Sequence, residues 1–366
     1  MSCEHPGDRS QEKSSQDAPM VMSTPTLRFR RTKERTYWQA VLAKLIRDKL
    51  ALAAIFGLVV MVILSVAAGW ISEQVLGFDP TTTNLAKRNA PPTWAAVAWP
   101  IFQEFTQTCQ AGGVTTCRWS LWRAIVSTSL TGLRDCLAAP RGTCHWMGTD
   151  QAGRDVLSRA LYGGRISMRI GLYVASISMT LGVVLGLVSG YYAATFIDDI
   201  INAIIQTLGS IPLLFLLIIL SRIFQPGPEG LSFLIGIFGW MGVSRLIRGQ
   251  IFSIREREYI LASRAIGASI WRILFRHILP NVSSIVIVVG VFNVAGAIIA
   301  EAGLSYLGVG IGPPLPSWGN MMQGSLGNFT DAPWLVLAPG LFIFLTTLSI
   351  YLIGDGLRDA LDPWVR

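Results

Sequence analysis

The stretch REREYILASRAIGASIWRILFRHILPN, residues 255–281, is a charged segment between two strongly apolar ones. From Glu258 to His277 its apolar residues recur at helical spacing, and Gly267 interrupts the pattern. One apolar stripe holds Ile266, Ile270, Ile273 and Leu274. We expect Pro280 to break this helix before the next apolar segment, because proline has no N–H to donate.

The same segment has the features of a docking element. Ala262, Ser263 and Gly267 are small, so the backbone of a partner can approach closely. Arg257 and Arg264 share another side of the helix. A short helix with an apolar stripe and a basic side fits a protein partner. An amphipathic helix lying on anionic lipid is the alternative.

The composition outside this segment is that of a membrane protein. The 366 residues are 51% hydrophobic and 14% charged, whereas an ordinary soluble domain is about 25% charged. Lys and Arg cluster beside apolar runs and form no face interleaved with aromatic residues. The net charge of +8 therefore indicates membrane topology and does not favour a nucleic-acid partner.

Crossing a bilayer takes about 20 apolar helical residues. Runs of suitable length are Leu50–Ser72, Ile170–Ile197, Ile200–Ser221, Ile278–Ala300 and Ala332–Gly354. A sixth run, Gly230–Ser244, is short. It crosses if Arg245 reaches the head groups, and it is a re-entrant helix otherwise.

Basic residues crowd the segment before the first run, which predicts that the N-terminus is cytoplasmic. Six spans then place the C-terminus and the quoted segment in the cytoplasm as well. One flank disagrees with this topology, because Arg154, Arg159, Arg165 and Arg169 fall on the predicted outside and Asp198 and Asp199 fall inside.

The predicted organisation has five parts. They are a cytoplasmic tail (1–49), a first transmembrane helix (50–72), an extracytoplasmic loop (73–164), a transmembrane core (165–357) that includes the docking segment (255–280), and a cytoplasmic C-terminal tail (358–366). Residues 1–27 are polar, and we expect them to be disordered.

The long loop carries four of the five cysteines. Cys109, Cys117, Cys136 and Cys144 face an oxidising compartment in this topology, so we expect two disulfides of unspecified connectivity. A zinc site is the alternative, but the short gap of structural zinc motifs is missing. Residues 145–167 read as an amphipathic helix capped by Thr149 or Asp150, lying at the membrane interface or in a folded cap.

No pattern for catalysis, for a metal or for a cofactor is visible. Of the three histidines, His5 falls in the N-terminal tail, His145 on the predicted outside and His277 in the docking segment, so we do not expect them to converge on one metal. Glu301 sits at the outer end of the fifth span, where it faces water or a pore mouth or is a solvated interfacial carboxylate. Lysine is absent after Lys87, so the chain lacks a phosphate-binding loop of the G-x-x-x-x-G-K-[ST] type. Any power from ATP must come from another polypeptide.

Residues 261–280 resemble the coupling motif of permease subunits of binding-protein-dependent ABC importers. That motif reads E-A-A, three residues, Gly, nine residues, Ile-x-Leu-Pro. The corresponding residues are Leu261-Ala262-Ser263, Gly267 and His277-Ile278-Leu279-Pro280. Leu261, Ser263 and His277 depart from the motif, which has Glu, Ala and Ile at these positions.

Two further segments resemble hallmarks of the C-type subunit in the dipeptide/oligopeptide/nickel branch. They are HWMGTDQAGRDVLSRALYGGRIS (145–167) and AEAGLSYLGVGIGPPLPSWGNMM (300–322). The resemblance runs from about Arg47 to the C-terminus and does not explain the cysteine-bearing loop or the N-terminal tail.

The resemblance implies an all-α, six-span ABC type I permease of the bacterial cytoplasmic membrane. Its implied partners are a homologous second permease, two ATP-binding subunits that hydrolyse the ATP, and an extracytoplasmic solute-binding protein. The residues implied in ATPase coupling are Ala262, Ser263, Arg264, Gly267, Leu279 and Pro280. We expect short peptides as the substrate. The alternatives are nickel or another small solute, a secondary transporter, and a membrane-embedded enzyme or assembly scaffold.

Overall fold

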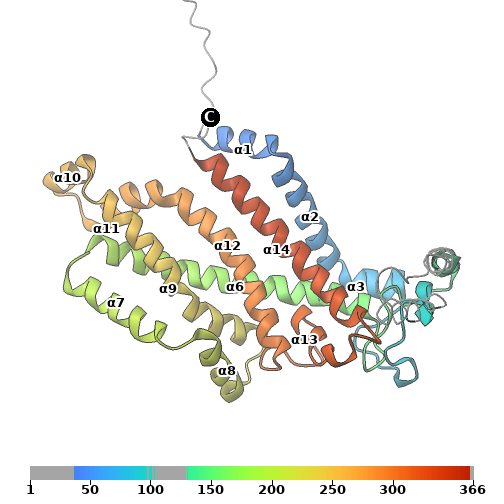
Figure 1. Cartoon of the computed structure of the whole chain (residues 1–366). Helices are drawn as coiled ribbons and strands as arrows, with labels where there is room; N and C mark the ends of the chain where they lie inside the picture. Colours follow the sequence, from blue (N-terminus) through green and yellow to red (C-terminus); the bar gives the residue numbers. More distant parts are fainter. Residues whose placement is uncertain (1–36, 97–98, 101–102, 104–128, 130, 363–366) are drawn as a thin grey trace, which may run out of the picture.

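The computed structural model describes residues 37–96, 99–100, 103, 129 and 131–362, whose regular elements are helices (Figure 1). Five helices are long and apolar enough to cross a bilayer: Lys49–Val66 (α2), Val156–Tyr191 (α6), Pro228–Ile254 (α9), Ile270–Tyr306 and Trp334–Leu361 (α14). A bent pair, Phe196–Gly209 (α7) and Leu213–Phe224 (α8), passes the same test together. Counted as one span, it completes the six that the sequence predicts.

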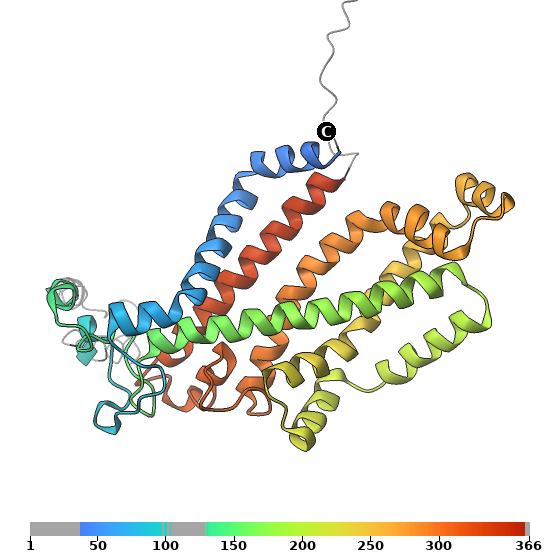
Figure 2. The ribbon, with the colours of Figure 1, turned by 180° about the vertical axis from the view of Figure 1, so that it is seen from behind.

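Helices α6 and α9 pack against each other in the bundle, and they cross in both views (Figures 1 and 2). Glycines on one stripe of α6 face β-branched residues of α9: Gly182, Gly186 and Gly190 against Val243, Ile247 and Ile251. A Cβ on Gly186 would lie 2.9 Å from the Cβ of Ile247. The glycines therefore allow the two backbones to approach closely, as small residues do between membrane helices.

The predicted straight span Ile200–Ser221 is wrong. Helices α7 and α8 meet at an angle of 77°. The break falls just before and at Pro212, which has no N–H and disfavours helical geometry at the residue that precedes it. The sequence contains this proline, but a prediction from hydropathy alone does not take account of the helix break that a proline causes.

The short run Gly230–Ser244 is part of α9, a helix of 27 residues. At 1.5 Å per residue this continuous helix is about 40 Å long, which is long enough to cross a bilayer. The re-entrant alternative for this run is therefore wrong, and the bent pair is the discontinuous element instead.

The predicted helix break at Pro280 is also wrong. A short helix Ile270–Arg272 (α11), a π-helical turn Ile273–Ile278 (η5) and Leu279–Tyr306 (α12) run on without interruption. Pro280 lies in the first turn of α12, where its missing N–H costs little. The chain breaks instead at Gly267, whose φ of +78° lies in the left-handed region.

Residues 145–167 do not form a separate interfacial helix. Helix α6 begins at Val156 and continues for 36 residues into the membrane. Its N-cap is Asp155, whose carboxylate accepts a hydrogen bond of 2.8 Å from the Ser158 N–H, so neither Thr149 nor Asp150 caps it. Thr149 and Asp150 lie in the loop that precedes the helix.

A helix within the predicted tail, Tyr37–Arg47 (α1), packs on the last turns of α14. Val41 and Leu45 contact the cluster that contains Ala360 and Leu361. Lys44 Nζ donates to the Asp359 carbonyl at 2.6 Å. The segment before the first span and the end of the last span therefore lie at one end of the bundle (Figure 1).

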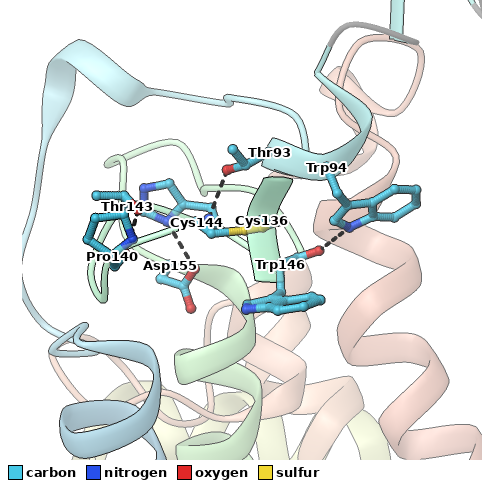
Figure 3. Close-up of a disulfide and its surroundings, with 9 residues drawn as sticks. Thr93, Trp94, Cys136, Pro140, Thr143, Cys144, Trp146 and Asp155 are labelled. Carbon is cyan, nitrogen blue, oxygen red and sulfur yellow. Dashed lines mark hydrogen bonds and ion pairs between the residues drawn. A yellow bond between two sulfur atoms is a disulfide. The ribbon is translucent and has the colours of Figure 1, made fainter. Parts of the chain in front are cut away.

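The described parts of the long loop fold onto the opposite end of the bundle. The Trp94 indole N–H donates to the Trp146 carbonyl at 2.8 Å (Figure 3). The Trp334 indole N–H, at the start of α14, donates to the Thr149 carbonyl at 3.1 Å. Trp99 packs edge-on against Trp334. These contacts fasten the loop to the first turn of the last span.

Candidate functional site

Helix Glu258–Ala265 (α10) projects from one end of the bundle beyond the neighbouring helices (Figure 1). Ala262, Ser263 and Arg264 lie on this helix, and Gly267 lies in the turn that follows it. Leu279 and Pro280 lie at the start of α12, beyond α11 and the π-helical turn. The structure thus brings four of the six predicted coupling residues together at the tip, whereas Leu279 and Pro280 lie apart from it at the start of α12.

The tip presents large apolar side chains that the described residues do not cover. Ile266 is 86% exposed and Trp271 is 64% exposed, and Trp271 stacks on Phe275 with ring centroids 5.8 Å apart. A Cβ on Gly267 would meet no atom within 4 Å. The single stripe expected from the sequence is divided, because Ile266 and Ile270 are exposed whereas Ile273 and Leu274 are buried.

The base of the tip is packed into the bundle. Ile260 of α10 is fully buried in a cluster with residues of α6, α9, η5 and α12. The members of this cluster at its centre are Ile247, Ile251, Ile273, Leu274 and Ile278. Burying each of these aliphatic side chains contributes about 1.5–3 kcal/mol to the free energy of folding, relative to leaving it exposed to water. An exposed tip on a packed base can transmit a push on α10 to α6, α9 and α12.

Cationic side chains join the tip to the end of α6. The Arg264 guanidinium lies 4.6 Å from the ring centre of Tyr191, in cation–π geometry. Arg255 donates from Nη1 to the carbonyls of Tyr191 and Ala193, at 3.3 and 3.0 Å. The turn after α6 is therefore held by the same segment that leads into α10.

A buried carboxylate, Asp198, lies close to this turn. Arg248 of α9 donates to both of its oxygens, from Nε at 2.7 Å and from Nη2 at 2.6 Å. Ser189 of α6 donates at 2.5 Å and Asn202 of α7 at 2.6 Å. The Ala194 N–H completes the set at 3.1 Å. Asp198 thus connects α6, α7 and α9 at the end that carries α10.

Sequence reasoning missed this cluster and used Asp198 only as a sign of topology. Its spacing to Asn202 matches a helical turn, but its main partner, Arg248, is 50 residues away. The spacing of polar residues near Asp198 indicates only a polar helix face. It cannot identify a partner that is so far away in the sequence.

A second buried carboxylate, Glu301, lies at the opposite end of the bundle. It is fully buried, so the expectations of a solvated interfacial carboxylate and of one that faces water or a pore mouth are both wrong. Ser167 of α6 donates to one of its oxygens at 2.8 Å, and Ser305 donates to the other at 2.7 Å. Ser305 also accepts from the Ile311 N–H at 2.9 Å. Glu301 therefore fastens α12 to α6 and to the segment after α12.

The four arginines that disagree with the predicted topology all have partners. Arg154 and Arg159 pair with Asp150, at 2.8 and 3.4 Å. Arg165 donates to the Val66 carbonyl at 2.7 Å, and Arg169 pairs with Glu229 at 2.8 Å. Each of these arginines is held by a partner within this chain. The count of arginines in this flank is therefore a weak indicator of which side of the membrane the flank occupies.

Of the cysteines, Cys136 and Cys144 form a disulfide with Cα atoms 5.6 Å apart (Figure 3). Cys109 and Cys117 lie outside the described residues, so the prediction of two disulfides stays a prediction. His145, next to the disulfide, lies 3.0 Å from Asp155 through Nδ1. Among the described residues, no group of three or more His, Cys, Asp or Glu side chains is arranged to hold a metal ion.

Two family models match this chain. The model of the binding-protein-dependent transport system inner membrane component matches residues 182–366. The model of the N-terminal transmembrane domain of oligopeptide transport permease C matches residues 36–92. The cysteine-bearing stretch lies between the two matches.

Curated relatives match more than half of the chain. The oligopeptide transport system permease protein OppC of Bacillus subtilis is 39% identical over 227 residues, which are 62% of this chain and 74% of the relative. The dipeptide transport system permease protein DppC of the same organism is 41% identical over 228 residues, 62% of this chain and 71% of the relative. OppC of Mycobacterium bovis is 41% identical over 235 residues, 63% and 80% of the two chains.

Proposed function

Because the chain belongs to the family of binding-protein-dependent transport system inner membrane components, we propose that it carries short peptides across the cytoplasmic membrane as one subunit of an ATP-driven importer. The relatives named for oligopeptide and dipeptide transport support the peptide substrate. In this role the chain performs no covalent chemistry, and transport proceeds by a shift between inward-open and outward-open states.

The observation that carries this proposal is the exposed tip on its packed base. Ile266 and Trp271 offer apolar area to a partner, and Ile260 ties the tip to the core of the bundle. A pair of ATP-binding subunits that closes on nucleotide would move α10, and α6, α9 and α12 would move with it. Since the chain has no lysine after Lys87, the nucleotide belongs on those separate subunits.

The proposed assembly also contains a homologous second permease and an extracytoplasmic solute-binding protein. Helices α7 and α8 leave large apolar side chains uncovered, including Phe196, Phe215 and Ile223. These faces suit lipid and the second permease. In the proposed orientation the tip and both chain ends are cytoplasmic, so the cysteine-bearing loop faces the binding protein. The coupling role of Ala262, Ser263, Arg264, Gly267, Leu279 and Pro280 is part of the same proposal.

The substrate is tested by uptake in a strain that lacks this chain. We expect the loss of import of labelled di- and tripeptides, with recovery when the chain is restored. Intact peptide import together with lost nickel import would contradict the peptide proposal and favour the nickel alternative.

A further inference from the structure

A polar pocket lies where the bent pair breaks, between α7 and α9. It is lined by Asn202, Ile205, Gln206, Gly209, Ser210 and Arg245. Its volume of about 400 Å³ is within the range of small-molecule sites, about 300–1,000 Å³. In secondary transporters the substrate commonly lies beside a discontinuous helix, and the same physical logic applies to a break that borders a pocket here.

Arg245 supplies the charge of this pocket. Its side chain is exposed and makes no hydrogen bond or ion pair with the described residues. An ideal Cβ on Gly209 would lie 3.8 Å from its Nη2, so the guanidinium reaches the end of α7. The next arginine of α9, Arg248, is instead paired on both arms with Asp198. Arg245 therefore presents its fork of N–H donors to whatever enters the pocket.

The α7 wall adds neutral polar groups. Asn202, Gln206 and Ser210 are spaced by four residues and so share one face of the helix. The Asn202 amide N–H is bonded to Asp198, which leaves its oxygen free to accept. Gln206 has no side-chain hydrogen bond within the described part of the chain. Among the described residues that line the pocket there is no carboxylate, so the pocket suits an anionic group, and its neutral amides suit peptide bonds beside that group.

The face of α9 that bears Arg245 is open. Gly242 and Gly249 lie one turn before and one turn after it, and a Cβ on either would meet no atom within 4 Å. An extended chain can therefore lie along α9 across Arg245 without steric obstruction from the described residues.

From this geometry we propose that Arg245 contacts the free C-terminal carboxylate of a peptide in transit. Gln206 and Asn202 then form hydrogen bonds with amide groups of the same peptide. The inference rests on the proposed peptide substrate. A guanidinium and a carboxylate form paired, charge-assisted hydrogen bonds of defined geometry. Because the site is exposed, the contact is weak enough to release the peptide, as conduction requires.

The test uses the whole transporter, in which this chain, the second permease, the ATPases and the binding protein are reconstituted in liposomes. Two probes are compared, trialanine with a free carboxylate and trialanine amide, each at a concentration that saturates the binding protein. Should the binding protein reject the amide, both labelled peptides are measured by equilibrium binding to the purified permease–ATPase complex.

With Arg245→Gln we expect uptake or binding of the acid to fall about tenfold and that of the amide to change less than twofold. A tenfold change corresponds to a free energy of about 1.4 kcal/mol, which is near the lower end of what a hydrogen bond to a charged group contributes. Arg245→Lys keeps the charge and should retain most of the preference for the acid. Arg222→Gln, at an exposed position of α8 outside the pocket, is the matched control and should keep the wild-type preference.

An equal fall for both probes would overturn the inference, and so would no fall for either. An effect of Arg245→Gln that disappears in liposomes without anionic lipid would also overturn it, because it would identify a lipid head group as the ligand. Failure of the wild-type transporter to import the acid contradicts the proposed function itself. Normal import of the acid with an indifferent Arg245→Gln variant contradicts only this inference.

Discussion

At the scale of single residues, two buried carboxylates hold the helices together, and their partners come from distant parts of the chain. Asp198 accepts from three helices, and Glu301 joins two helices and a loop. A buried charge that loses its partner is costly, whereas the same charge with all its bonds made holds its neighbours in one geometry.

We expect Asp198→Asn to destabilise the end of the bundle that carries α10. The variant keeps the size of the side chain but leaves the Arg248 guanidinium without its counter-charge, at a cost of about 1.5–3 kcal/mol. Thermal unfolding of the purified transporter should begin several degrees lower, and coupled uptake should fall.

The matched control is Asp199→Asn, which removes the neighbouring exposed carboxylate. The double variant Asp198→Asn with Arg248→Gln should lose less stability than the two single losses added together, because both charges are then absent. Equal unfolding temperatures for Asp198→Asn and Asp199→Asn would show that the cluster has no structural role.

The cysteines give a second prediction at this scale. We expect two disulfides, Cys136–Cys144 and Cys109–Cys117, because the first pair is joined in the structure and the second pair is all that is left in the loop. Closing loops of this size contributes about 2–3 kcal/mol to the stability of the loop. Mass spectrometry of non-reduced peptides from native membranes measures both, and four freely alkylated thiols would refute the prediction.

At the scale of the elements, hydropathy predicted where helices cross and missed how they are interrupted. The run Ile200–Ser221 reads as one span, yet Pro212 divides it into α7 and α8. Conversely, Pro280 reads as a break, yet it falls in a first helical turn where proline is tolerated. The effect of a proline depends on the register of its helix, which short-range patterns do not fix.

The predicted site shows the same limit. The sequence placed Ala262, Ser263, Arg264 and Gly267 on an exposed element, where the structure also has them. It could not show that Ile260 anchors this element or that Arg264 lies over Tyr191, because both contacts join residues that are far apart in the chain.

Ala262→Leu tests whether α10 docks on a partner. Gly267→Leu is a less clear test, because a left-handed φ strains any side chain there by about 1–2 kcal/mol whatever the partner. Ala262 is an exposed helical position, and leucine forms helices nearly as well as alanine. Overpacking an interface by a leucine costs about 1–3 kcal/mol, so ATPase binding should weaken roughly ten- to hundredfold.

This prediction is checked by co-purification of the ATPase and by ATP-dependent peptide uptake at equal membrane abundance. Ala53→Leu, at an exposed position of α2, makes the same change far from α10 and should leave both readouts normal. If α10 only lies on anionic lipid, Ala262→Leu will also be normal in both.

At the scale of the whole molecule, the bundle has two different ends. One end carries α10, the Asp198 cluster and the contact between α1 and the end of α14. The other carries Glu301 and the loop with its disulfide and tryptophans. This division fits a transporter that is driven from one side and loaded from the other.

The most direct test of this account is photo-cross-linking from position 266, the most exposed large apolar position on the tip. A photoreactive phenylalanine analogue replaces Ile266 in the whole transporter in native membranes, and the same analogue at Phe329, exposed at the opposite end, is the control. The account predicts a nucleotide-dependent adduct with the mass of this chain plus one ATP-binding subunit from position 266 and none from position 329. Adducts with lipid alone from position 266, in membranes where the ATP-binding subunits co-purify with the chain, would contradict it.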